Sequence, residues 1–215
     1  MCFSLAASFG AAAILVIAGI ASIVKVRQQK QLLFAAIPIV FALQQSAEAL
    51  IWLTARNITL NTLKTELTYF FLFVAESVWP VWVPLSLLLM ERSKIRKTIL
   101  AGLFIIGLFT SVYLAFYILT YGVEARILNC NILYLQHLRS PYTVLTSIPY
   151  LLAVIIPFFV SGVKGMRLPG IFILACLAVT KVFGGYQLLS VWSLYAVLVS
   201  IIIYYQISSR RIQPE

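Results

Sequence analysis

Long runs of apolar residues, separated by short polar segments, recur along the whole chain. Each run is close to the roughly 20 residues that a helix needs to cross the hydrocarbon core of a membrane. None shows the alternation of apolar and polar positions that is typical of a membrane-spanning β-strand. The pattern therefore predicts seven transmembrane helices, which cover Phe3–Val24, Leu32–Leu53, Leu67–Leu89, Thr98–Leu119, Tyr142–Val163, Leu168–Phe183 and Gln187–Ile207.

The composition supports this interpretation. Of the 215 residues, 62% are hydrophobic and 10% are charged, and the mean hydropathy is +1.02. A soluble domain has about a quarter charged residues. Because the connections are short, we expect a single domain, residues 1–215, with an all-α fold: a polytopic transmembrane bundle of seven helices. The longest connection, Thr120–Pro141, has room for structure of its own.

Lys and Arg concentrate in alternate connections. Eleven of the sixteen follow the first, third and fifth predicted helices or lie in the tail, and five lie on the opposite side. Since cytoplasmic connections are enriched in these residues, we expect the N-terminus outside and the C-terminus in the cytoplasm. The net charge of +10 is explained by basic loops facing anionic lipid. The expected partner is therefore the lipid bilayer, and no nucleic acid is needed.

Small residues fill much of the first predicted helix, between Ala6 and Ala21. Small faces let helices approach closely in lipid. We therefore expect this helix to pack inside the bundle, or against a partner subunit, rather than to face lipid.

Glu76 is the most informative residue of the sequence. It lies within the third predicted helix, where an ionisable side chain is costly and indicates a functional site by default. Pro80 follows four residues later and cannot donate a hydrogen bond to the Glu76 carbonyl. The sequence therefore predicts a carboxyl group and a free backbone carbonyl at one level of the membrane, where an ion, a proton or a polar ligand can bind.

The second predicted helix carries a polar face. Gln44 and Gln45 precede Glu48 by four and three residues, so all three share one side of the helix, and Trp52 continues that side outward. Because the next helix runs back, Glu76 is expected at about the depth of Gln44. Interhelical hydrogen bonds that only hold the bundle together are an alternative for the glutamines, at about 0.6 kcal/mol each.

Two further residues are candidates for this predicted ligand site. Lys181 ends the sixth predicted helix on the outer side, where it can pair with Glu48 or Glu76 or extend to the lipid headgroups. Ser4 opens the chain on the same side.

The cysteines offer a different chemistry. Removal of Met1 would leave Cys2 with an amine and a thiol, a pair that can act as a nucleophile or bind a metal. Cys130 and His137 lie in the long outer connection. Three alternatives remain open: a Cys2–Cys130 disulfide, a soft transition metal held by Cys2, Cys130 and His137, or no relation between them. Cys176 is expected to fill apolar space.

The chain resembles an uncharacterised family of bacterial seven-helix membrane proteins that opens with Met-Cys-Phe-Ser. The similarity rests on Met1–Ser4 with Ala7-Ser8, Gln44-Gln45-x-x-Glu48 with Trp52, Trp79–Pro84 and Val191-Trp192. The resemblance implies the fold and a location in the bacterial inner membrane, and it supplies no activity.

Three functions are compatible with these residues. The first is binding or transport of a small polar or amphipathic ligand by Glu48, Glu76, Gln44 and Gln45 in the outer half of the bundle. The second is a membrane enzyme or a metal or redox protein that uses Cys2, and the third is an accessory subunit. A retinal protein is excluded because the last predicted helix lacks lysine, and a three-histidine zinc hydrolase because the chain has one His.

Overall fold

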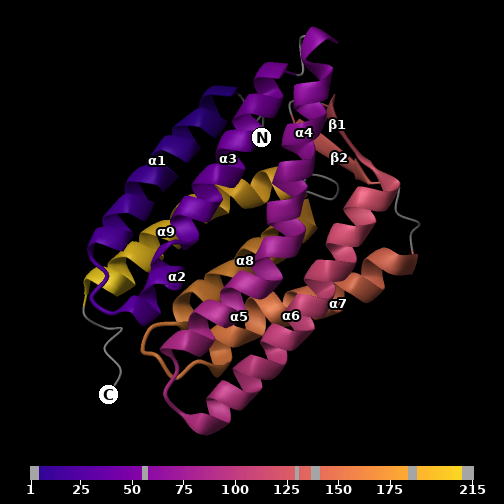
Figure 1. Ribbon diagram of the computed structural model, residues 1–215. Coiled ribbons are helices and arrows are strands. Elements are labelled where there is room, and N and C mark those ends of the chain that lie inside the picture. The colour runs from indigo at the N-terminus through magenta and orange to yellow at the C-terminus, as the bar shows by residue number, and fades with distance from the viewer. Residues whose placement is uncertain (1–4, 55–57, 129–130, 137–140, 184–187, 210–215) are drawn as a thin grey trace.

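A computed structural model describes residues 5–54, 58–128, 131–136, 141–183 and 188–209, and these form mostly helices (Figure 1). A π-helix, Val74–Val78, joins α4 to α5 without a break in the rod. The α-helices are α1 (Leu5–Val24), α2 (Leu32–Ala35), α3 (Ile37–Thr54), α4 (Asn61–Phe73), α5 (Trp79–Met90), α6 (Lys94–Tyr121), α7 (Pro141–Val160), α8 (Arg167–Phe183) and α9 (Leu188–Ser208). Two short 3₁₀ turns, Gln29–Gln31 and Ile58–Leu60, precede α2 and α4.

Four helical segments are long and apolar enough to cross a membrane. They are Leu5–Val24, Gln29–Thr54, Asn61–Met90 and Lys94–Tyr121, and shorter apolar stretches cover Ser147–Val160, Arg167–Val179 and Tyr195–Ser208 in the described part of the chain. The expectation of a mostly helical protein with membrane-capable helices is therefore confirmed.

The first helix differs from the expectation. One face of α1 is buried against α3 and α9, and Gly19 lies so close to Ile39 of α3 that a Cβ there would collide with its side chain. The opposite face exposes large apolar side chains such as Ile17 (69% exposed) and Ile20. The interior position predicted from the small residues is wrong, because only some of them, such as Ala11, Ala12 and Gly19, are buried. Others, such as Ala13, are exposed, as are the large β-branched side chains. In Figure 1, α1 lies at one edge of the bundle.

The connection after α6 folds into a β-hairpin. Gly122 ends α6 at a φ of +74°, a conformation that glycine adopts without steric cost. Strands β1 (Val123–Leu128) and β2 (Asn131–Gln136) then pair antiparallel, with Val123 opposite Gln136. The hairpin lies beside α4 (Figure 1). We call this end of the bundle the hairpin end.

Two apolar clusters form the core. The larger one draws residues from α1, α2, α3, α5, α6, α7, α8 and α9 and contains Phe34, Leu87 and Phe158. The smaller one lies at the hairpin end, where Ile132 of β2 and Ala125 of β1 pack with Phe71 and Ile51. This second cluster fixes the hairpin on the ends of α3, α4 and α6.

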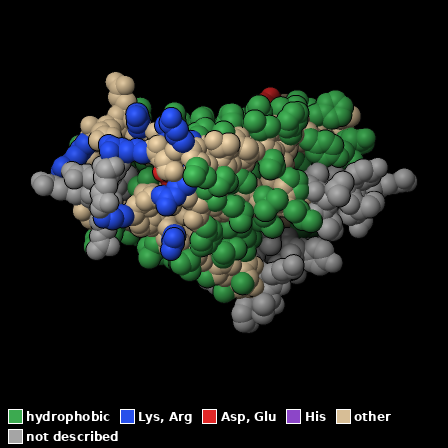
Figure 2. Space-filling model, turned by 90° about the horizontal axis from the view of Figure 1, so that it is seen from below, with side chains coloured by type: hydrophobic (Ala, Val, Ile, Leu, Met, Phe, Trp, Pro, Cys, Tyr) green, Lys and Arg blue, Asp and Glu red, His purple; other side chains and the backbone are tan. Residues whose placement is uncertain are grey.

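The opposite end of the molecule, which we call the basic end, carries most of the positive charge. Figure 2 shows Lys and Arg gathered over one end, with hydrophobic side chains over much of the remaining surface in view. The basic residues here lie in the connections α1–α2, α5–α6 and α7–α8 or in the first turns of α6 and α8. They include Lys25, Arg27, Lys30, Arg92, Lys94, Arg96, Lys97, Lys164 and Arg167.

Candidate functional site

Glu48 is almost completely buried within α3. Its side chain is 1% exposed, and its Oε2 accepts a hydrogen bond of 3.0 Å from Nε2 of Gln45, which is 2% exposed. The three-residue spacing places both side chains on one face of the helix, as the sequence predicts. An acid and an amide are thus held together inside an apolar bundle.

The hairpin closes this pair from one side. Tyr134 of β2 stacks on Phe71 of α4 with ring centroids 4.5 Å apart, and its hydroxyl oxygen is buried. Burial raises the pKa of the Tyr134 phenol well above its usual value, and the nearby negative charge of Glu48 raises it further. The phenol therefore stays protonated, and its O–H is available to donate a hydrogen bond.

Several buried polar atoms near Glu48 have no hydrogen-bond partner in the part of the chain that the structure describes. They are Oε1 of Gln45, Nε1 of Trp52 and the hydroxyl of Tyr134. Such atoms are rare in folded proteins, because each costs about 1–3 kcal/mol when it is desolvated without a partner. We call Gln45, Glu48, Trp52 and Tyr134 the acid cluster.

Ser8 of α1 lies at the level of the acid cluster. Helices α1 and α3 are in contact at Gly19 and Ile39. Counted from this contact toward the hairpin end, the eleventh residue is Ser8 in α1 and Leu50 in α3. Ser8 is 1% exposed, and its hydroxyl has no partner among the described residues. In addition to Gln45 and Glu48 of α3, α1 therefore contributes the buried hydroxyl of Ser8, which lies within about one helical turn of the level of Glu48.

Gln44 belongs to a separate contact. Its Oε1 accepts a hydrogen bond of 3.1 Å from Nε1 of Trp79, which links α3 to α5. The Trp79 ring also packs on Phe41 at a centroid distance of 4.2 Å. Gln44 thus holds two helices together, which is the alternative that the sequence left open for the glutamines.

Glu76 occupies the π-helix, and its carboxyl is partly buried. In the i+5 pattern of a π-helix, the Ala75 carbonyl faces the nitrogen of Pro80, which has no hydrogen to donate. The hydroxyl of Tyr150 in α7 donates to this carbonyl instead, at 2.6 Å. The sequence predicted a free backbone carbonyl at Glu76. In the structure, the carbonyl left without a backbone donor is that of Ala75, one residue earlier, and Tyr150 donates to it.

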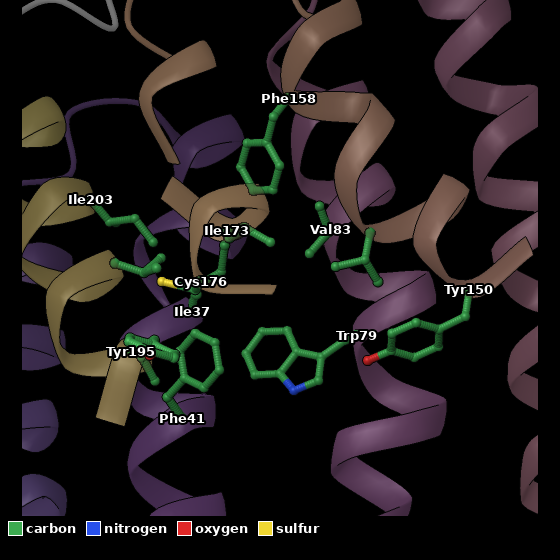
Figure 3. A pocket seen from close by; sticks show the side chains of 13 residues that line it. Ile37, Phe41, Trp79, Val83, Tyr150, Phe158, Ile173, Cys176, Tyr195 and Ile203 are labelled. Carbon is green, nitrogen blue, oxygen red and sulfur yellow. The ribbon is translucent and has the colours of Figure 1, made fainter. Parts of the chain in front are cut away.

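An apolar cavity lies beside the Trp79 ring, between α3, α5, α7, α8 and α9. Its volume is about 30 Å³, enough for roughly two water molecules. Figure 3 shows Trp79 between Phe41 and Tyr150, with Cys176 and Tyr195 on the far side. Trp79 therefore separates an apolar space from the amide of Gln44.

Several residues of the predicted sites lie outside the part of the chain that the structure describes. Cys2, Ser4, Cys130 and His137 lie outside the described residues, and so does the side chain of Lys181, whose backbone belongs to α8. The predicted transition-metal site at Cys2, Cys130 and His137 thus stays a prediction. Within the described ranges, no group of three His, Cys, Asp or Glu side chains gathers.

Sequence reasoning did not select Ser8, Tyr134 or Tyr150 for this region. Tyr134 lies in the connection that was left without elements, and Tyr150 lies between two prolines of an apolar helix. The sequence shows only that these hydroxyl groups lie in predicted transmembrane helices or in the long outer connection. It does not show which helix each hydroxyl group faces.

The comparisons with known proteins give a family and nothing more specific. A family model described as a family of unknown function, DUF6629, matches residues 1–215. No curated protein and no solved structure matches the chain.

Proposed function

Because the chain belongs to the DUF6629 family, whose function is unknown, we propose a function from the geometry of its buried polar groups. We infer a seven-span protein of the bacterial inner membrane, with its N-terminus outside and its C-terminus in the cytoplasm. In this proposal it binds a small polar or amphipathic ligand at the acid cluster, in the outer half of the bundle.

The burial of Glu48 carries the proposal. An ionisable side chain that is 1% exposed inside a membrane-capable helix is costly to keep. If residue 48 only had to accept a stabilising hydrogen bond from Gln45, the amide of a glutamine at this position would serve as well as the carboxyl group. The carboxyl group therefore favours a role that needs charge or proton exchange.

The neighbours of Glu48 define the chemistry of the ligand. Gln45 offers a carbonyl oxygen, and Trp52 and Tyr134 offer N–H and O–H donors. A small molecule with both donors and acceptors, or a hydrated cation, matches this set.

The hairpin and the irregular helices are the elements through which a ligand would reach the acid cluster. The hairpin covers the acid cluster through Tyr134, so displacement of the hairpin would admit a ligand from the outer side. The π-helix and the prolines of α5 and α7 interrupt the regular hydrogen-bond pattern of their helices. Irregular helices border the binding sites of many transporters. Transport is therefore included in the proposal alongside binding.

Thermal unfolding of the purified protein separates a functional acid from a structural one. We expect Glu48→Gln to unfold within about 2 °C of the wild type or at higher temperature, because the amide keeps the bond from Gln45 and removes a costly acid. Glu124→Gln, on the exposed face of β1, is the control. A loss of several degrees in Glu48→Gln alone would show that the acid supports the fold and would contradict the proposal.

A further inference from the structure

At the basic end, one buried acid joins two connections that are far apart in the sequence. Glu91, at the end of α5, is 5% exposed, and its Oε2 accepts a hydrogen bond of 2.6 Å from the backbone N–H of Gly162, after α7. Its Oε1 accepts from the backbone N–H groups of Arg92 and Ser93 at 3.0 and 3.1 Å. The α5–α6 and α7–α8 connections are thereby held side by side.

Arg96 lies directly over this junction. A Cβ on Gly162 would collide with the Arg96 guanidinium, so the absence of a side chain at Gly162 is what lets the guanidinium lie there. The positive charge of Arg96 is also close enough to Glu91 to help lower its pKa. Arg96 is nevertheless exposed, so its guanidinium faces the surface as well as the loop.

The junction gathers far more positive than negative charge. Residues 91–97 and 161–167 contain six Lys and Arg side chains and one acid, and the oxygens of that acid already accept three backbone hydrogen bonds. Helices α6 and α8 both begin here, with the positive ends of their dipoles directed at the same region. The basic residues of the junction are Arg92, Lys94, Arg96, Lys97, Lys164 and Arg167.

Large apolar side chains begin immediately beside these charges. Ile95 is 76% exposed and Ile99 is 47% exposed on α6, and Leu168 and Ile171 are more than half exposed on α8. A surface with cations at one level and exposed apolar side chains in the next turn matches a phospholipid, whose phosphate and acyl chain are arranged in the same order. A free phosphate would leave the apolar residues uncovered.

We propose that the junction of the α5–α6 and α7–α8 connections is a specific binding site for the phosphate headgroup of an anionic phospholipid. Arg96, positioned over Gly162, is the central phosphate contact, and Lys164 and Arg167 contribute charge from the second connection. The acyl chains lie against the exposed apolar faces of α6 and α8. This site is separate from the acid cluster and does not depend on the function proposed for it.

Native mass spectrometry of the full-length protein, with added phosphatidylglycerol or phosphatidylcholine, tests this site. We expect the wild type to retain phosphatidylglycerol in preference to phosphatidylcholine. Arg96→Gln should lower the affinity for phosphatidylglycerol about fivefold, the effect of one cation at a membrane surface. Gly162→Ala keeps every charge but displaces the Arg96 guanidinium, and it should weaken binding to a similar extent.

Two matched controls separate a site from general attraction. Lys30→Gln removes a charge from the same end but from another connection, and Gly102→Ala adds a methyl group on α6 where nothing lies within 4 Å. Both should bind like the wild type. Equal loss in Lys30→Gln and Arg96→Gln, or no preference for phosphatidylglycerol, would overturn the proposal. Full displacement of the lipid by equimolar inorganic phosphate would overturn it as well and would point to a soluble ligand.

Discussion

At the scale of single residues, the two glutamates predicted to bind a ligand differ in their surroundings. Glu48 is 1% exposed beside Gln45 and Tyr134, whereas Glu76 is partly buried in the π-helix near Tyr150. The sequence favours Glu76 as the centre of the site, because Pro80 follows it by four residues. Burial and the neighbouring polar atoms favour Glu48 as the centre of the site.

The Gln44–Trp79 hydrogen bond is expected to stabilise the bundle without taking part in binding. A double-mutant cycle with Trp79→Phe and Gln44→Leu should give a coupling energy of about 0.6 kcal/mol, typical of interhelical bonds in membranes. The free energy of unfolding in mixed micelles is the measurement. A coupling energy indistinguishable from zero would mean that this bond contributes nothing to the pairing of α3 with α5.

Glu91 is expected to make stability depend on pH. Burial alone would raise its pKa, but hydrogen bonds from the backbone N–H groups of Gly162, Ser93 and Arg92 and the charge of Arg96 lower it below 4.5. An acid with a lowered pKa in the folded state stabilises the protein at neutral pH, and this contribution is lost as the pH falls below about 4.5.

The unfolding temperature, followed from about pH 7 to about pH 3, measures this contribution. The wild type should lose stability toward the acid end more steeply than Glu91→Gln, which is less stable than the wild type at neutral pH. Parallel curves for the two proteins would show that the Glu91 carboxylate does not stabilise the connection.

At the scale of elements, the rod formed by α4, the π-helix and α5 shows what a proline signal can and cannot predict. The irregular turn before Pro80 follows from the missing N–H. The donor that compensates at the Ala75 carbonyl is Tyr150 of α7, 75 residues away, and this partner cannot be found from the local sequence. The hairpin was not predicted either, because two strands of six residues carry too little pattern to be recognised within a connection.

The compensation at the π-helix can be tested by restoring the missing donor. Tyr150→Phe should cost about 1–2 kcal/mol of unfolding free energy, because it leaves the Ala75 carbonyl without its hydroxyl donor in an apolar bundle. In a Pro80→Ala background, residue 80 regains an N–H, and the same change should cost measurably less. An equal cost in both backgrounds would contradict the role assigned to Pro80.

At the scale of the whole molecule, the apolar runs located the helical rods within a few residues. The run predicted at Phe3–Val24 matches α1 (Leu5–Val24), and that at Thr98–Leu119 lies within α6 (Lys94–Tyr121). Hydrophobic length is a local property, so one chain suffices to find it. Which polar side chains meet depends on the rotation and register of neighbouring helices, and this explains why Ser8 was missed. Tyr134 was missed because its strand was not predicted.

Ligand binding by the acid cluster is tested most directly by native mass spectrometry of gently purified wild-type, Glu48→Gln and Glu124→Gln proteins. The wild type and Glu124→Gln, whose altered side chain lies on the exposed face of β1, should carry the same small molecule or ion. Glu48→Gln should be bare while keeping the wild-type fold. Retention of the same bound mass by Glu48→Gln, or a bare wild-type protein, would contradict the assignment of Glu48 as the binding group.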